Sequence, residues 1–233
     1  ILARQIISQE KNAAELRKDT LNLQKLKERK RKPLVCVSLD RSLSHLEYLP
    51  SLYESIKKKQ VLHLSYAKRY EESINVMFHP HLLKEYNGRW FVLGVDECGD
   101  YKNYSLDRIH SYSVVTGIDY IPIKDAEYKY WNQIIGVSHQ EWTDVVHITL
   151  KTHSLYKHGL FVSKRFHESQ HEVLAFGNHD GEEYGMLSID IVPNKEFYGR
   201  MLLYGDDIEV VSPSDVREQV KKRIEALRQR YST

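Results

Sequence analysis

The chain has 233 residues, of which 41% are hydrophobic and 28% are charged, and its formal net charge at pH 7 is +2. This composition is typical of a globular protein, and so small a charge does not by itself indicate nucleic-acid binding. No apolar run approaches the roughly 18 residues of a membrane span, and the two cysteines are too few for a disulfide framework. We therefore expect a cytoplasmic protein with no membrane partner. The chain begins at Ile1 rather than at a methionine, so we expect a fragment of a longer protein.

The first 32 residues are predicted to be helical, with a strongly basic end. Apolar residues recur at spacings of three, four and seven as far as Leu26, without glycine or proline. Basic residues then gather over 25–32, before Pro33. This run could contact phosphate, although a solvated linker is the simpler interpretation. We assign residues 1–32 to a helical linker or the remnant of a preceding domain.

Residues 33–120 are predicted to form one helix and a small antiparallel sheet. Pro50 suits a first helical turn, and the helix is expected to end near Lys59. Asn87-Gly88 is a strong hairpin signal, because both central residues of a type I′ turn need positive φ. A small sheet avoids exposed edges by curling into an SH3-like or Sm-like barrel. The expected strands are 61–66, 74–78, 89–95, 101–106 and 111–115, and His79-Pro80-His81 is expected to stop the second one.

Residues 121–233 follow a different pattern, with a linker helix and then strands that alternate with helices. Asn194 is a candidate cap for the second of these helices, which is expected to close at Gly205. Ser212-Pro213 offers a cap and a first-turn proline for a final helix. The order βαββαβ with a trailing helix is the ferredoxin-like arrangement, so the whole chain is predicted to be α+β. The expected strands are 145–150, 171–176, 184–192 and 208–211, and the final helix carries Val216, Val220, Ile224 and Leu227 on one face.

The sequence offers little that points to catalysis or metal binding. The sequence has no Gly-rich phosphate loop, no G-x-S-x-G elbow and no His-Glu-x-x-His motif. His167 and His171 are four apart, but the second begins a predicted strand, where that spacing does not bring both rings to one metal. His79 and His81 are two apart at a strand end, so their rings point the same way and suit an anion, a base or a metal. They could equally be ordinary surface histidines. We expect neither catalysis nor a metal nor a cofactor.

Several segments resemble the WYL domain and the C-terminal extension that commonly follows it. Members of this family are mostly bacterial transcription regulators, in which an N-terminal winged helix-turn-helix binds DNA. Their WYL domain, an Sm-like barrel, senses a ligand that is often proposed to be a nucleotide or single-stranded nucleic acid. No winged helix is recognisable in residues 1–32. The matching segments are Ser65-Tyr66, His79-Pro80-His81-Leu82, 88–93 and 104–109 for the domain, and 165–170, 203–210 and Ser212-Pro213 for the extension.

The resemblance implies a ligand site on the barrel. Two arginines would fork onto phosphate, and Tyr66 would stack on a base. Ser105 stands where many members carry an arginine, which implies weaker phosphate binding or a different ligand. Arg108 could instead pair with Asp107 within a turn. The implied contact residues are Ser65, Tyr66, His79, His81, Arg89 and Arg108.

We therefore expect the ligand-sensing and dimerisation region of a bacterial transcription regulator. A homodimer is expected because paired DNA half-sites match twofold symmetry, and DNA is a partner if a winged helix precedes the fragment. The N-terminal helix or the face of the second sheet would supply the dimer contact. One alternative is an interaction module that only dimerises the regulator and binds no ligand. Another is an RNA-binding accessory factor of a nucleic-acid defence system.

Overall fold

The computed structural model describes residues 45–67, 72–139 and 144–232. These residues form two compact units, divided between Pro122 and Ile123. Each unit contains one antiparallel sheet with helices, so the α+β class is confirmed. That each unit folds by itself stays a prediction. The helical segment expected over 1–32 lies outside the described residues. No described helix is long and apolar enough to cross a membrane.

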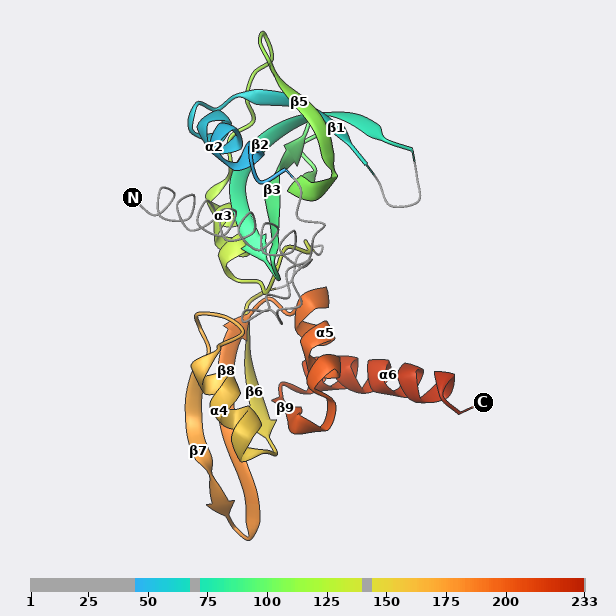
Figure 1. Ribbon diagram of the computed structural model, residues 1–233. Coiled ribbons are helices and arrows are strands. Elements are labelled where there is room, and N and C mark those ends of the chain that lie inside the picture. Colours follow the sequence, from blue (N-terminus) through green and yellow to red (C-terminus); the bar gives the residue numbers. More distant parts are fainter. Residues whose placement is uncertain (1–44, 68–71, 140–143, 233) are drawn as a thin grey trace, which may run out of the picture. The chain divides into compact units, whose positions relative to one another are not determined.

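The first unit is a five-stranded antiparallel sheet with a helix packed against it (Figure 1). The strands lie in the order β4-β3-β2-β1-β5, so the two edge strands are consecutive in the chain. A short 3-10 turn, η2, joins them. The elements are α2 (Tyr48–Lys57), β1 (Val61–Tyr66), β2 (Ile74–Tyr86), β3 (Arg89–Asp96), β4 (Tyr101–Ser105), η2 (Leu106–Arg108) and β5 (Ile109–Val115).

The hairpin between β2 and β3 turns where the sequence predicted. Asn87 and Gly88 both have positive φ, 52° and 78°, and Tyr86 pairs with Arg89 across the turn. This is the backbone geometry that a two-residue turn between right-twisted strands requires. The Asn-Gly prediction is therefore confirmed.

The expected end of β2 was wrong, because the strand continues through Pro80 as far as Tyr86. Proline lacks an N–H group and is tolerated in a strand mainly at an edge or a bulge. The pairing of β2 with β3 shifts between Pro80 and Leu82, so a bulge lies at this point. The bulge takes up the proline and lets the strand run on.

The core of the first unit joins α2 to the inner face of the sheet. Phe78 and Leu62 are fully buried, and Leu52 from the helix packs in the same cluster. Trp90 is only partly buried and packs against the border of this core. The buried members are Leu49, Leu52, Leu62, Leu64, Tyr66, Phe78, Val92, Tyr104, Leu106 and Ile109.

The second unit is a four-stranded antiparallel sheet in the order β7-β8-β6-β9. Asn194 accepts a hydrogen bond from Phe197 N–H at 3.1 Å, and Gly205 has a positive φ of 53°, so the predicted cap and stop of α5 are confirmed. The elements are α3 (Asp125–Asn132), β6 (Val146–Thr152), α4 (Leu155–Ser163), β7 (His171–His179), β8 (Glu182–Ile191), α5 (Lys195–Tyr204), η3 (Gly205–Asp207), β9 (Ile208–Ser212) and α6 (Ser214–Arg230).

The predicted cap of the last helix was wrong. Ser212 is the final residue of β9, and α6 begins at Ser214 with Pro213 before it and no side-chain cap. Pairing of Ser212 with Thr149 in β6 holds it in the sheet, where it is not available as a cap.

Gly94 in β3 is predicted to be irreplaceable, because β2 passes close beside it. A Cβ atom there would lie 2.1 Å from the carbonyl oxygen of His79. We expect Gly94→Ala to lower the free energy of unfolding by about 1–3 kcal/mol, measured by urea denaturation. Gly159→Ala in α4 is the contrast, since a Cβ there meets nothing within 4 Å. It is expected to raise stability by up to about 1 kcal/mol. Equal effects of the two substitutions would contradict this account.

Candidate ligand site

Arg108 lies at the end of η2 and is fixed to the end of β1. Its Nε donates a hydrogen bond to the carbonyl oxygen of Ala67 at 2.8 Å, and Ala67 N–H donates back to the carbonyl of Arg108 at 2.9 Å. The guanidinium carbon lies 4.8 Å from the centroid of the Tyr66 ring, which is a cation–π contact. The side chain is half-buried. Arg108 and Tyr66, both predicted site residues, are therefore brought together.

Tyr66 is part of the core as well as of this site. Its ring meets the ring of Tyr104 edge-on at 4.6 Å, and Tyr104 meets Phe78 in the same way at 5.0 Å. The Tyr66 hydroxyl accepts a hydrogen bond from Ser105 N–H at 3.4 Å. Burial is the largest influence on the hydroxyl of Tyr104 and raises its pKa. The stacking of a base on Tyr66 stays a prediction, and the structure gives that ring two protein neighbours, Tyr104 and Arg108.

Asp107 links the second arginine to the same turn. Arg89 Nη1 lies 3.3 Å from Asp107 Oδ2, and the Ser105 hydroxyl donates a hydrogen bond to the other carboxylate oxygen. The Arg89 side chain is 30% exposed, while that of Asp107 is 11% exposed. Asp107 thus pairs with Arg89, from a different strand, and not with its neighbour Arg108. The sequence reasoning did not include Asp107 in the site, although it stands within the Leu-Asp-Arg segment.

Ser65 lies next to Tyr66 on β1 but on the other face of the sheet. Alternate residues of a strand point to opposite faces. Tyr66 is buried in the core, while Ser65 is half-buried opposite Asn75 of β2 and Ser111 of β5. The structure therefore separates the side chains of the expected Ser-Tyr pair.

His79 and His81 are both buried, and both bind the main chain of Ile121. His79 Nδ1 accepts a hydrogen bond from Ile121 N–H at 3.0 Å, and His81 Nε2 donates to the carbonyl of the same residue at 2.8 Å. The Tyr120 hydroxyl donates to the carbonyl of Pro80 at 2.6 Å. The two rings point the same way, as their spacing predicted. They hold the segment after β5 against β2, and their contact with a ligand stays a prediction.

No group of three or more His, Cys, Asp or Glu side chains within the described ranges could hold a metal ion. His167 and His171, which are four positions apart in the sequence, have different partners. His167 Nε2 bonds to the carbonyl of Asn132 at 2.7 Å, and its Nδ1 lies 2.8 Å from the Ser169 hydroxyl. His171 is the first residue of β7 and pairs with Ser188 in β8.

Two family models match the chain. The model of the WYL domain matches residues 47–114, and that of the WCX domain matches residues 158–228. The chain contains a WYL domain followed by a WCX domain. The WYL match contains Arg89, Arg108 and the η2 turn with Asp107. The candidate site therefore lies wholly inside the WYL domain. The WCX match is the C-terminal extension that the sequence predicted, and it includes most of α6.

Two of the solved structures that are similar to this chain have low sequence identity to it. One is Proteasome accessory factor B/C (PafBC) of Arthrobacter aurescens, with 14% identity, a TM-score of 0.32, and coverage of 84% of this chain and 29% of that chain. The other is a CRISPR Cas-related protein, with 13% identity, a TM-score of 0.42, and coverage of 79% and 52%. This chain thus spans about a third and about half of the two neighbours' lengths. No match was found among curated proteins.

The hydrogen bonds of His79 and His81 to the main chain of Ile121, which we call the histidine clasp, predict a loss of stability in acid. Burial, and then the charge of His81, lower the pKa of His79, and Asp96 opposes them only in part. The unfolded chain therefore takes up a proton first as the pH falls below about 6.5, the ordinary pKa of histidine. Stability is full above that pH and declines below it, by at most about 1.4 kcal/mol per pH unit for one proton.

His79→Asn tests this reasoning, because the asparagine oxygen still accepts from Ile121 N–H but does not titrate. Urea denaturation above and below pH 6.5 is expected to show a weaker pH dependence for this variant than for the wild type. His110→Asn, at an exposed position in β5, is the matched control and should keep the wild-type dependence. Identical slopes for all three proteins would remove His79 as the cause.

Proposed function

We propose that this chain is the ligand-sensing region of a transcription regulator, and that its WYL domain binds a nucleotide or single-stranded nucleic acid. The family match supports a regulatory or sensing role. The main observation in favour of a phosphate-bearing ligand is that Arg89 and Arg108 both lie at the η2 turn. Arg89 is held by Asp107 and Arg108 by Ala67. Two oriented guanidinium groups suit an oxyanion, because each can donate a fork of parallel hydrogen bonds.

Arg108 is the better placed of the two for phosphate. Among the described residues its Nε donates to Ala67, which leaves the donors of the two terminal nitrogens for a phosphate. The guanidinium group lies over the Tyr66 ring, and this contact restricts the rotamers of Arg108. A side chain already ordered loses less conformational entropy on binding than a mobile one. The arrangement therefore supports binding of a phosphate group by Arg108.

We also propose that the first sheet curls into the Sm-like barrel of the family. Five flat strands would span about 19 Å from edge to edge, since neighbours lie about 4.8 Å apart. The step from Ser105 at the end of β4 to Ile109 at the start of β5 covers at most about 14 Å of extended chain. Because β4 and β5 are opposite edges, the sheet must bend for η2 to join them.

The second unit supports a ferredoxin-like assignment. β6 and β7 lie on either side of β8, and β9 adds to the far side of β6. All pairs are antiparallel, which is the pattern of a βαββαβ unit whose crossover helices α4 and α5 skip one strand. The region is proposed to bind and not to catalyse, and to act as a homodimer in a regulator that contacts DNA through another domain.

One observation favours a second function, an interaction module without a small ligand. The ring of Tyr66 has Tyr104 on one side and Arg108 over it, so a base could stack there only after Arg108 moves. In a pure interaction module these contacts would serve the fold alone. Salt separates the two functions, because nucleic-acid affinity falls steeply with ionic strength and an apolar protein contact does not.

Arg108→Ala is expected to weaken binding of a labelled oligothymidine roughly ten- to a hundredfold. One charge-assisted hydrogen bond contributes about 1.5–3 kcal/mol. Fluorescence anisotropy over a salt series should also show the slope of log affinity against log salt reduced by about 0.7, the contribution of one phosphate contact on a single strand.

Lys57→Ala is the matched control, since this exposed lysine at the end of α2 carries the same charge away from the site. It should leave both affinity and slope unchanged. Unchanged binding by Arg108→Ala at normal thermal stability would remove Arg108 from the site. Oligothymidine and nucleotides that fail to bind the wild-type chain would favour the interaction module.

A further inference from the structure

Among the residues that the structure describes, the last helix, α6, contacts the second unit through its first half. Val216 is buried, and Arg217 pairs with Glu209 of β9. Arg223 lies over the ring of Tyr198 in α5, 4.0 Å from its centroid. Every residue from 224 to 232 is exposed. Figure 1 accordingly shows α6 running away from the sheet of its own unit.

This exposed half carries a narrow apolar seam. Ile224, Leu227 and Tyr231 follow at spacings of three and four, which places them on one side of a helix. Their exposed fractions are 52%, 44% and 83%. Val220 continues the seam one turn earlier, where it is half-buried. The sequence predicted that Val216, Val220, Ile224 and Leu227 share one face of α6, and of the residues described in this helix only Val216 is buried.

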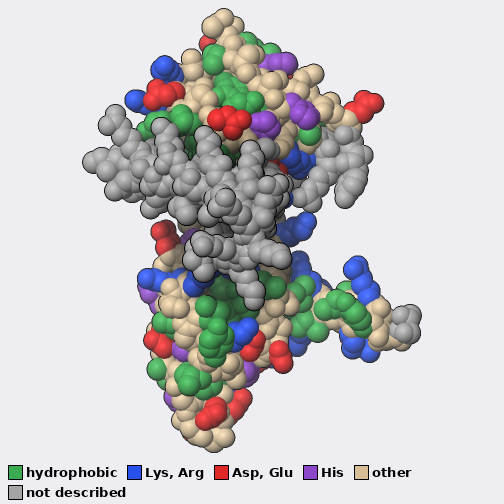
Figure 2. Space-filling view, in the orientation of Figure 1, with side chains coloured by type: hydrophobic (Ala, Val, Ile, Leu, Met, Phe, Trp, Pro, Cys, Tyr) green, Lys and Arg blue, Asp and Glu red, His purple; other side chains and the backbone are tan. Residues whose placement is uncertain are grey.

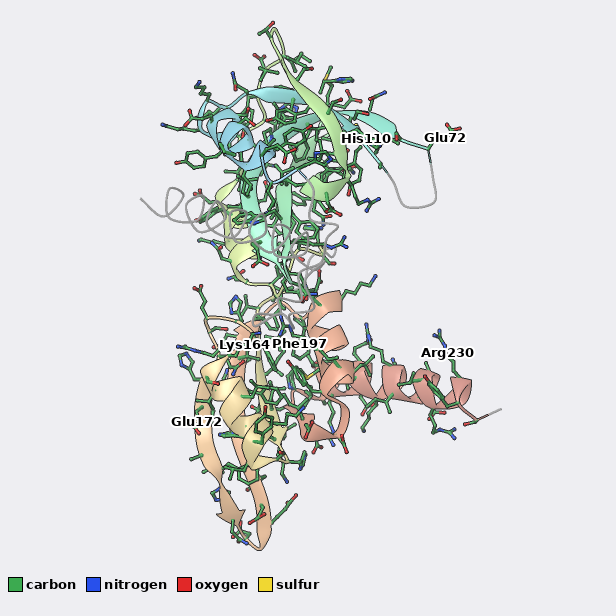
Figure 3. All side chains as sticks on the ribbon, in the orientation of Figure 1. Glu72, His110, Lys164, Glu172, Phe197 and Arg230 are labelled. Carbon is green, nitrogen blue, oxygen red and sulfur yellow. The ribbon has the colours of Figure 1, made fainter. Side chains whose placement is uncertain are left out.

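Basic side chains border the seam on both sides. Lys221 and Arg228 follow one side, and Arg223 and Arg230 the other, by the angular positions of a helix with 3.6 residues per turn. Figure 2 shows the apolar side chains of α6 between groups of Lys and Arg. Arg230, labelled in Figure 3, projects from the last turn. The helix as a whole has six Lys and Arg residues against three Asp and Glu.

The carboxylates of α6 do not neutralise the basic residues beside the seam, because they lie farther round the helix from it. Glu218 pairs with Lys221 at 2.6 Å, and Glu225 pairs with Arg228 at 2.8 Å, both on the side turned away from the seam. These are exposed pairs along one helix, which contribute little energy and open easily. The surface offered to a partner is therefore apolar in the middle and positive at both rims.

We propose that residues 220–231 form a docking helix for a partner protein with an apolar groove and an acidic rim. Anchors at spacings of three, four and seven are the pattern with which a helix fills such a groove. The acidic rim follows from charge complementarity with the four bordering bases. This inference is independent of the ligand proposed for the WYL domain.

Three other occupants fit this surface less well. A second copy of α6 would bring two positive rims together, whether the helices ran parallel or antiparallel. A lipid surface favours a broad apolar face, of about 100° or more on a helix, and this seam is narrower. Nucleic acid would pair its phosphates with the basic rims and leave the apolar seam without a partner.

Calcium-loaded calmodulin is a defined probe for this chemistry, because it presents an apolar groove that accepts basic amphipathic helices. Isothermal titration calorimetry with the full chain should show binding that weakens with salt. Leu227→Glu is expected to weaken it at least roughly tenfold, as loss of a central anchor usually does. Ala226→Glu is the matched control, because it adds the same charge at a neighbouring exposed position away from the seam.

Arg230→Glu tests the rim separately and should weaken binding most at low salt. Because Leu227 and Arg230 are both exposed, the variants should keep the wild-type thermal stability, and circular dichroism checks the helix. The proposal is overturned if the wild-type chain does not bind, or if Leu227→Glu and Ala226→Glu bind equally. Three further assays test the other occupants: self-association by sedimentation, binding to phosphatidylserine vesicles and binding to duplex DNA. The proposal is also overturned if Leu227→Glu abolishes any one of these while calmodulin binding persists.

Discussion

The ring of Tyr66 is shared between the core of the first unit and the candidate site. One side packs on Tyr104, which in turn packs on Phe78 in the middle of the sheet, and Arg108 lies over the ring itself. The direction of Arg108 therefore depends on core packing and not on surface contacts alone. Aromatic pairs of this kind contribute about 0.5–1.5 kcal/mol beyond the area they bury. A change in the core, for example at Phe78, is transmitted to the guanidinium through only two rings.

The histidine clasp secures the opposite side of the same strand. Phe78 points into the core, while His79 points to the other face and binds Ile121. Protein interiors require a hydrogen-bond partner for each buried polar group, and the main chain of Ile121 supplies one for each ring. β2 is therefore covered on both faces beside its bulge, and the bulge itself is what allows Pro80 in mid-strand.

Features set by neighbouring residues could be predicted from the sequence, and features set by distant ones could not. The Asn87-Gly88 turn and the Asn194 cap depend on a few adjacent positions, and the structure has both. The partners of His81 and His79 lie 40 and 42 positions away along the chain, in a segment with no periodicity to indicate it. The pairing of Arg89 with Asp107 likewise depends on how β3 meets η2. The family resemblance implied Arg89 and Arg108 as contact residues, but it did not indicate that Asp107 would pair with Arg89.

Ser105 is tied by hydrogen bonds to both Tyr66 and Asp107. The resemblance implied an arginine at this position and hence one more cation near the ligand. In this chain Ser105 is buried, its N–H donates to the Tyr66 hydroxyl, and its own hydroxyl donates to Asp107. Asp107 then holds Arg89. A long charged side chain at 105 would have to leave the core, and Asp107 would lose a donor. Position 105 thus carries one positive charge fewer than the resemblance implied, while Arg89 on β3 is held in a fixed direction by a carboxylate that Ser105 itself orients.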